Sequence, residues 1–234
     1  MILTAHQPCY LPWLGLFHKI AISDLFCYFD IVQYQKKDFN NRNKIKTING
    51  EIWLSVPVES KNHLSKNVSQ IPIIKNNWVN KHIKSIEINY RKAAYFENYF
   101  EDISRLLNVN SNDNLGKLNL SLLKYFLNVL SIETPIVLAS DYNFIGEKSN
   151  LVLDMCKKLK ATKYIFGANG LNYADTRSFK KNNIKIHFQD YRHPTYRQLN
   201  GCFLPYMSVI DLLFNEGQNS KNIILKNNIK KNQI

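Results

Sequence analysis

The first 32 residues, MILTAHQPCYLPWLGLFHKIAISDLFCYFDIV, decide the fold of this 234-residue chain. Residues 2–5 are a short apolar run that predicts a buried strand. Pro8 and Pro12 bracket a rigid loop behind it, because each proline disfavours helix in the residue before it. From Trp13 onward apolar residues recur at helical spacing, and residues 25–32 are rich in strand-forming side chains. Strand, loop, helix and strand within about 30 residues is the length of a βαβ unit, whose strands are parallel.

The remainder of the chain continues this alternation with one interruption. Asn49-Gly50 is the strongest hairpin turn signal, and it separates residues 44–48 from residues 51–58, which we expect to pair. A strand at 70–74 and two long amphipathic helices at 77–108 and 114–131 complete this expected insert. Further strands are expected at 135–139, 163–166 and 184–188, and helices at 149–160, 173–182 and 208–214. The pattern predicts an α/β fold, a doubly wound, mostly parallel sheet with a β-hairpin and helical insert.

A chain of this length can bury a full core as one domain, which we place at residues 1–217. Residues 218–234 form a basic, Asn- and Lys-rich C-terminal segment, which predicts a solvated tail. No apolar run reaches the roughly 18 residues of a membrane-spanning helix, and the N-terminus lacks the basic region of a signal peptide. We therefore expect a cytoplasmic protein without a membrane span. Its scattered cysteines are then free thiols: Cys9, Cys27, Cys156 and Cys202.

The formal net charge of +13 invites a nucleic-acid interpretation, which the distribution of the charge argues against. Only six of the 31 basic residues are arginine, and the lysines travel with abundant Asn and Ile, as in a protein from an AT-rich coding sequence. Nucleic-acid binders usually concentrate basic and aromatic side chains on one helix or groove. We therefore expect a small anionic partner, such as a nucleotide-linked molecule, in place of nucleic acid.

Three polar clusters follow predicted strands. The first is the segment from His6 to Trp13, where a histidine can act as general base or donate to phosphate. Ligands of open α/β sheets bind beyond the carboxyl ends of strands, so the position favours a site. A purely structural histidine in a proline-shaped turn explains the same residues equally well.

The second cluster contains Arg42 between Asn41 and Asn43, in a segment expected at the same end of the sheet. The guanidinium fork suits phosphate or carboxylate, and the amides suit hydroxyl groups. An ordinary solvated Asn-rich loop is the alternative.

The third cluster, residues 191–198, holds one histidine, two arginines and two tyrosines, or is a surface loop ordered by aromatic packing. Asp211 falls in the first turn of a predicted helix, where a carboxylate is stabilised by the helix dipole in any case. Similarly, a lone histidine such as His82 on an apolar helix face beside Lys81 is more often a satisfied core or boundary residue than a ligand contact. We find no metal-binding or phosphate-loop motif, so no metal and no cofactor are expected.

Taken in order along the chain, several segments resemble the signature of the WbqC-like proteins. They are His6-Gln7-Pro8, Tyr10-Leu11-Pro12-Trp13, Phe17 and Lys19, Asn41-Arg42-Asn43, Trp53-Leu54, Trp78 with Lys81-His82, Ser140-Asp141, Gly146 with Lys148, Tyr164 with Gly167, Tyr191, His193-Pro194, Tyr196, Gln198 and residues 208–215. Cys9 stands where the family more usually shows a small polar residue. A lone cysteine without an identified partner is weak evidence for a nucleophile.

The resemblance implies a protein of bacterial surface-polysaccharide gene clusters, such as those for O-antigen and lipopolysaccharide, acting on activated sugars. We expect a transferase that moves an acyl or aminoacyl group, from a donor such as an acyl carrier thioester, to a nucleotide-linked amino sugar. The alternative is a non-catalytic sugar-nucleotide-binding or scaffolding protein.

On residues and resemblance together, the expected catalytic residues are His6, His193 and Asp211. Arg42, Arg192 and Arg197 are expected to hold the anionic donor or diphosphate. The expected substrate-binding residues are Gln7, Tyr10, Trp13, Lys19, Asn41, Arg42, Asn43, Lys81, His82, Lys148, Tyr191, Tyr196 and Gln198.

Overall fold

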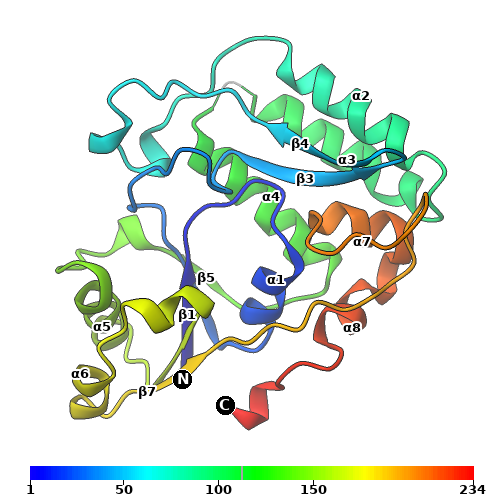
Figure 1. The fold of residues 1–234 in the computed structure, drawn as a ribbon. Helices are drawn as coiled ribbons and strands as arrows, with labels where there is room; N and C mark the ends of the chain where they lie inside the picture. The colour runs from blue at the N-terminus through cyan, green and yellow to red at the C-terminus, as the bar shows by residue number, and fades with distance from the viewer. Residues whose placement is uncertain (112) are drawn as a thin grey trace.

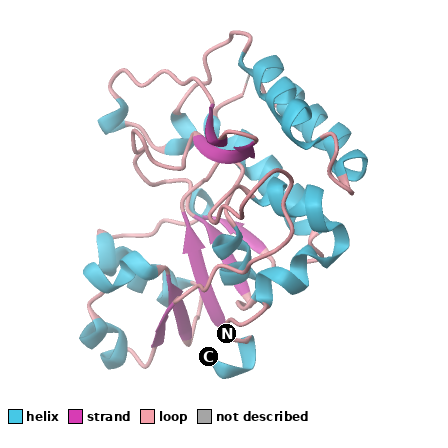
Figure 2. Cartoon of the chain, turned by 45° about the vertical axis from the view of Figure 1, so that its right-hand side comes forward, coloured by secondary structure: helices cyan, strands magenta, loops and turns pink. Residues whose placement is uncertain are grey.

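The protein is described by a computed structural model covering residues 1–111 and 113–234. In that part of the chain, one parallel sheet has the strand order β5-β2-β1-β6-β7 (Figures 1 and 2). Its strands are β1 (Ile2–His6), β2 (Leu25–Tyr28), β5 (Ile136–Leu138), β6 (Lys163–Phe166) and β7 (Lys185–Phe188). The predicted βαβ unit is confirmed, since β1 pairs in parallel with β2 and α1 (Leu14–Ala21) connects them.

The strand order reverses beside β1. The chain winds outward through β2 and β5 on one side of β1, and through β6 and β7 on the other. Both faces are covered, because α1 and α4 (Leu115–Val129) pack into one apolar core while α5 (Lys148–Lys158) and α6 (Thr176–Lys181) pack into another. This is the doubly wound arrangement that the sequence predicts, and it creates a topological switch point at the carboxyl ends of β1 and β6.

The predicted hairpin is confirmed as a separate two-stranded sheet, β3 (Arg42–Thr47) with β4 (Gly50–Ser55). Gly50 takes a positive φ of 111° at the turn, a conformation that favours glycine. In Figure 1 the hairpin lies beyond the carboxyl end of β1, with α2 (Trp78–Tyr90) and α3 (Phe96–Val109) on its far side.

Several predicted boundaries are wrong. The helix expected at 77–108 is two helices, because the chain turns after Tyr90 and the Tyr95 backbone N–H donates to the Phe214 carbonyl of another helix. The strand expected at 70–74 is reduced to isolated bridges after a 3-10 turn at Val68–Gln70, since Pro72 has no backbone N–H to donate. Strand β2 ends at Tyr28, where the Asp30 N–H turns back onto the Tyr28 carbonyl.

The C-terminal segment is folded onto the molecule, which corrects the expectation of a solvated tail. Helix α7 (Val209–Glu216) is followed by α8 (Ser220–Leu225), in which Ile224 is fully buried. Beyond α8, apolar residues pack against Ile2, at the amino end of β1, and against Ile165 of β6. Figure 1 shows the two termini close together. The isoleucines interleaved with Lys and Asn supply this contact.

No helix within residues 1–111 and 113–234 has the length and apolar character to cross a bilayer.

Candidate functional site

Several hydrogen bonds join the loop after β1 to residues 38–43, where the chain enters the hairpin. The backbone N–H of Tyr10 donates to the Phe39 carbonyl at 2.9 Å, Asn40 Nδ2 donates to the Pro8 carbonyl at 2.7 Å, and Asn43 Nδ2 donates to the Leu11 carbonyl at 2.6 Å. Asn40 and Asn43 are both fully buried. The first and second polar clusters of the sequence therefore meet at the carboxyl end of β1.

His6 is the last residue of β1 and remains partly exposed. Its Nδ1 lies 2.8 Å from the Gln7 carbonyl, so Nδ1 carries the proton and Nε2 presents a lone pair. Trp13 packs edge-on against the ring at 5.3 Å between centroids. Burial and the nearby charge of Lys19 lower the pKa of His6 to about 3. The imidazole is therefore neutral at physiological pH, with Nε2 unpaired among the described residues.

Lys19 places a buried ammonium at the switch point. The side chain is 2% exposed, and Nζ donates to the Ala5 carbonyl at 3.0 Å. No carboxylate of the described residues pairs with it. Burial lowers the pKa of Lys19 to about 8. A buried positive charge without a counter-ion is costly, so this position favours an anion beside it.

Gly167, immediately after β6, leaves space beside that ammonium. A Cβ built on Gly167 would meet Lys19 Nζ at 4.0 Å and no other heavy atom of the described residues within that distance. Gly167 is itself partly exposed, so this position borders solvent. Gly170 differs, since its Cβ would fall 2.5 Å from Phe166, which shows that this glycine serves packing.

Cys9 lies beside His6 but is poorly suited to be a nucleophile. Its Sγ is 3.5 Å from His6 Nδ1 and 3.4 Å from the Gln7 carbonyl to which it donates, and the residue is 3% exposed. Burial raises the pKa of the thiol far above its ordinary value. The thiolate that chemistry requires is therefore strongly disfavoured.

A row of aromatic rings connects His6 with the hairpin. Centroid distances are 5.3 Å from His6 to Trp13, 5.2 Å from Trp13 to Phe39 and 5.9 Å from Phe39 to Trp53. The Arg42 guanidinium lies 4.3 Å above the Trp53 ring. Gln7 joins the same region through Nε2, which donates to Asp38 Oδ2 at 3.0 Å.

The third predicted cluster forms a different, closed network around Asp211. The Asp211 carboxylate is fully buried and accepts from the hydroxyls of Tyr90 at 2.8 Å and Tyr196 at 2.7 Å, and from Gln198 Nε2 at 2.7 Å. Lys46 Nζ donates to Gln198 Oε1 at 3.2 Å. Burial raises the pKa of Asp211 although these donors oppose the shift. The geometry ties α7 to the hairpin and offers no opening for a ligand at the carboxylate.

His193 is also placed apart from His6. Its Nδ1 lies 2.9 Å from the Pro194 carbonyl, and its Nε2 accepts from the Tyr206 N–H at 3.1 Å, so both ring nitrogens are occupied. Tyr191 packs against Gly15 and donates to the Ile224 carbonyl at 3.3 Å.

The two arginines of the same segment are exposed, and their backbone groups bond to other elements. Arg192 contacts Asn228, and the Arg197 N–H donates to Glu216 at 3.0 Å. None of these contacts joins either arginine to His6.

The other expected binding residues lie elsewhere. Tyr10 and His82 are both buried and share a 2.8 Å hydrogen bond, and burial lowers the pKa of His82 to about 4. Asn41 accepts from Tyr34 and donates to the Val56 carbonyl, so its amide is used in folding the loop. Lys81 and Lys148 are exposed at the surfaces of α2 and α5.

Comparison with known proteins assigns the family of this chain. A model described as the WbqC-like protein family matches residues 7–223. The chain belongs to this family. "Uncharacterized protein Rv1507c" of Mycobacterium tuberculosis (strain ATCC 25618 / H37Rv) is 34% identical over 212 residues, which cover 90% of this chain and 92% of that protein. No solved structure gives a significant match. The resemblance inferred from the sequence motifs is thereby confirmed.

Within this WbqC-like domain, sequence reasoning missed Trp53 and Phe39 as site candidates and named Gly167 only among the residues of the family resemblance. The signal available for Trp53 was its place in the hairpin. Side chains alternate along a strand, so the ring between Ile52 and Leu54 lies on the face opposite to theirs. Phe39 carried no such signal, because its place depends on the long-range hydrogen bonds that join the two loops.

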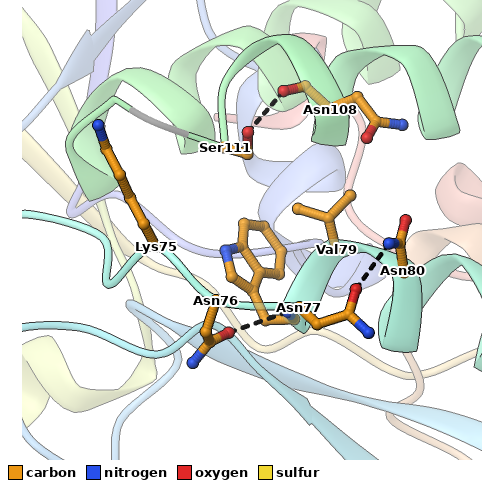
Figure 3. A pocket seen from close by; sticks show the side chains of 8 residues that line it. Lys75, Asn76, Asn77, Val79, Asn80, Asn108 and Ser111 are labelled. Atoms are coloured by element: carbon orange, nitrogen blue, oxygen red, sulfur yellow. Dashed lines mark hydrogen bonds between the residues drawn. The ribbon is translucent and has the colours of Figure 1, made fainter.

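A surface cavity of about 320 Å³ lies between the start of α2 and the end of α3, and none of the residues at the switch point lines it. Figure 3 shows hydrogen bonds that Asn76, Asn80 and Ser111 make to neighbouring residues of the cavity wall. Asn76 Oδ1 accepts from the Trp78 N–H at 2.9 Å, and Asn80 Nδ2 donates to Asn77 Oδ1 at 2.6 Å. These groups complete helix ends, so we assign the candidate site to the switch point and not to this cavity.

Among the described residues, no three His, Cys, Asp or Glu side chains lie close enough together to hold a metal ion.

Proposed function

We propose that this WbqC-like protein is a cytoplasmic transferase of bacterial surface-glycan biosynthesis, of the kind that makes O-antigen and lipopolysaccharide. It would move an acyl or aminoacyl group from a thioester to the amine of a nucleotide-linked amino sugar. The observation that carries the proposal is a neutral imidazole, His6, with an available Nε2 beside the uncompensated Lys19 ammonium at the sheet's switch point.

The chemistry follows from these two groups. The sugar amine must lose a proton as its nitrogen attacks the thioester carbon, and His6 Nε2 is the acceptor. A C–N bond forms, the C–S bond breaks, and the proton then passes from His6 to the departing thiolate. Lys19 favours the negative charge of the ligand or of the tetrahedral oxyanion.

Burial first, and the charge of Lys19 second, lower the pKa of His6 and make it a weak base in the unliganded protein. An anionic ligand beside Lys19 would offset the second of these effects and raise the pKa of His6 toward the range in which a general base is effective. Binding of the anionic substrate would thus activate the base.

The test is incubation of the purified protein with a panel of amino-sugar nucleotides and acyl or aminoacyl thioesters, with products measured by mass spectrometry. We expect one pair to give an amide product, and His6→Gln to lower kcat by about 10²–10⁴-fold. His63→Gln is the matched control, because that histidine belongs to a surface turn and bonds to the Ser60 carbonyl.

Two results would count against the enzyme. Full activity in His6→Gln would remove His6 from the mechanism. Binding of sugar nucleotides without turnover across the whole panel would favour the alternative, a non-catalytic sugar-nucleotide-binding or scaffolding protein.

A further inference from the structure

The outer face of the β3–β4 hairpin carries a group of aromatic and basic side chains, which we call the hairpin platform: Phe39, Arg42, Lys44 and Trp53. Lys44 is paired directly with Trp53, and Arg42 is two residues from Lys44, so the strand period places all three on one face. The Arg42 guanidinium and the Lys44 ammonium lie 4.3 and 5.1 Å from the Trp53 centroid.

Trp53 is 41% exposed although a buried position would be more favourable for so large an apolar ring. Further along the same face, Lys46 is covered by the segment after β7, where its Nζ donates to the Cys202 carbonyl at 2.6 Å. The hairpin is therefore closed at one end and open at Trp53.

The charges of the platform are incompletely neutralised. Lys44 forms an ion pair with Glu51 at 2.5 Å, but no carboxylate of the described residues pairs with Arg42. Arg42 donates from Nη2 to the Lys37 carbonyl, and its Nε is buried without a partner. A planar cation held on an indole, without a carboxylate partner among the described residues, is complementary to a planar ring that carries a phosphate.

The position of the platform also fits an elongated ligand. The ring row that begins at His6 passes through Trp13 and Phe39 and ends at Trp53. A nucleotide-linked sugar has its planar base at one end and its reacting sugar at the other, separated by a diphosphate. Basic groups stand near both ends of the row, Arg42 at the hairpin and Lys19 at the switch point.

We propose that the hairpin platform binds the nucleobase of a nucleotide-linked sugar, with the base stacked on Trp53 and the phosphate next to the nucleoside held by Arg42. This inference rests on the proposed function for the identity of the ligand. The other end of the diphosphate then lies toward Lys19, and the sugar amine reaches His6.

The experiment measures binding to the full chain by calorimetry with UDP, dTDP, CDP and GDP, and with inorganic pyrophosphate as the probe without a base. We expect at least one nucleoside diphosphate to bind more tightly than pyrophosphate. Trp53→Leu should weaken that nucleotide by about 10-fold or more while leaving pyrophosphate within about twofold, since stacking acts only on the base. Ile52→Ala is the matched control, an exposed apolar residue of the same strand on the opposite face.

Arg42→Gln provides a second variant that keeps Trp53. It should weaken both the nucleotide and pyrophosphate, because it removes a charge. The platform is overturned if no nucleoside diphosphate binds more tightly than pyrophosphate, or if Trp53→Leu, folded by circular dichroism, binds as the unsubstituted protein does.

These outcomes are independent of catalysis. Base-dependent binding that Trp53→Leu abolishes, without turnover of any thioester, would sustain the platform and reject the transferase. Turnover that depends on His6, with a KM unchanged by Trp53→Leu, would support the transferase and reject the hairpin platform.

Discussion

At the scale of single residues, the Lys19 ammonium determines how the candidate site responds to pH. Its pKa of about 8 lies below the ordinary value of 10.5, so the side chain is charged at pH 7 and mostly neutral at pH 9. We expect the ratio of UDP affinities between the unsubstituted protein and Lys19→Met to shrink by about tenfold over this interval. Titration of the ligand affects both proteins equally and therefore cancels in the ratio. Calorimetry at both pH values measures the affinities of the two proteins. A constant ratio would show that Lys19 does not bind the anion.

The same residue should cost stability in the absence of an anion. The unfolded chain holds the Lys19 proton up to about pH 10.5, and the folded chain only up to about pH 8. Between these values the unfolded state binds more protons, so the Lys19 contribution to stability rises with pH. Lys19→Met should therefore raise the free energy of unfolding at pH 7 by about 1–3 kcal/mol, measured in urea, even as it weakens anion binding. A large loss of stability would instead mean that the hydrogen bond to the Ala5 carbonyl dominates.

At the scale of elements, the loop after β6 contains two glycines with different roles: Gly170 is required for packing, and Gly167 leaves space for the proposed anion. Gly170→Ala forces a Cβ to within 2.5 Å of Phe166 and should destabilise the fold by about 1–3 kcal/mol. Gly167 has a φ of −70°, which any residue adopts, and Gly167→Val should leave the melting temperature nearly unchanged. It should nonetheless weaken pyrophosphate binding, because the side chain occupies the space beside Lys19. Unaltered binding in Gly167→Val would exclude this space as the anion position.

Helix α7 is held to the hairpin by the Asp211 network, which sequence reasoning assigned to catalysis. Asp211→Asn keeps the shape but replaces an acceptor oxygen by an NH₂ group facing hydroxyl and amide donors. We expect a loss of about 2–4 kcal/mol in the free energy of unfolding. Asn215→Asp is a useful comparison, since it adds a carboxylate one turn further along the same helix. Activity lost in Asp211→Asn with no loss of stability would return Asp211 to the active site.

At the scale of the whole molecule, the sequence predicts the layers better than the site. Local patterns identify the βαβ unit, the Asn49-Gly50 hairpin and the doubly wound sheet, because each depends on neighbours in the chain. His6, Lys19 and Gly167 lie together at the candidate site because β1 and β6 are neighbours in the sheet, and the periodicity of the sequence does not reveal the order of the strands. The composition of residues 191–198 is typical of a ligand-binding segment. In the folded protein, however, Tyr196 and Gln198 donate hydrogen bonds to the buried carboxylate of Asp211.

The C-terminal segment is where sequence and structure differ most, and it allows a direct test. Its composition predicts a solvated tail, but Leu225, Ile229 and Ile234 pack on the apolar group formed by Ile2, Ile22 and Ile165. Polar contacts add to this packing: Lys231 pairs with Asp24 at 2.5 Å, and the Ile229 carbonyl lies 3.1 Å from His18 Nε2. These contacts fix the amino ends of β1 and β6, the two strands whose other ends form the candidate site.

Removal of residues 227–234 should therefore lower the free energy of unfolding by about 1–3 kcal/mol, since Ile229 and Ile234 are partly buried and full burial of one such side chain contributes about 1.5–3 kcal/mol. Urea unfolding measures the loss, and Lys230→Ser with Lys231→Ser in the intact chain is the control for charge alone. We expect the control to lose less than about 1 kcal/mol, because surface ion pairs contribute little. If the truncated protein were as stable as the intact one, the segment would be the dispensable tail that its composition suggests. Greater sensitivity to the charge change than to the truncation would likewise show that apolar packing does not anchor it.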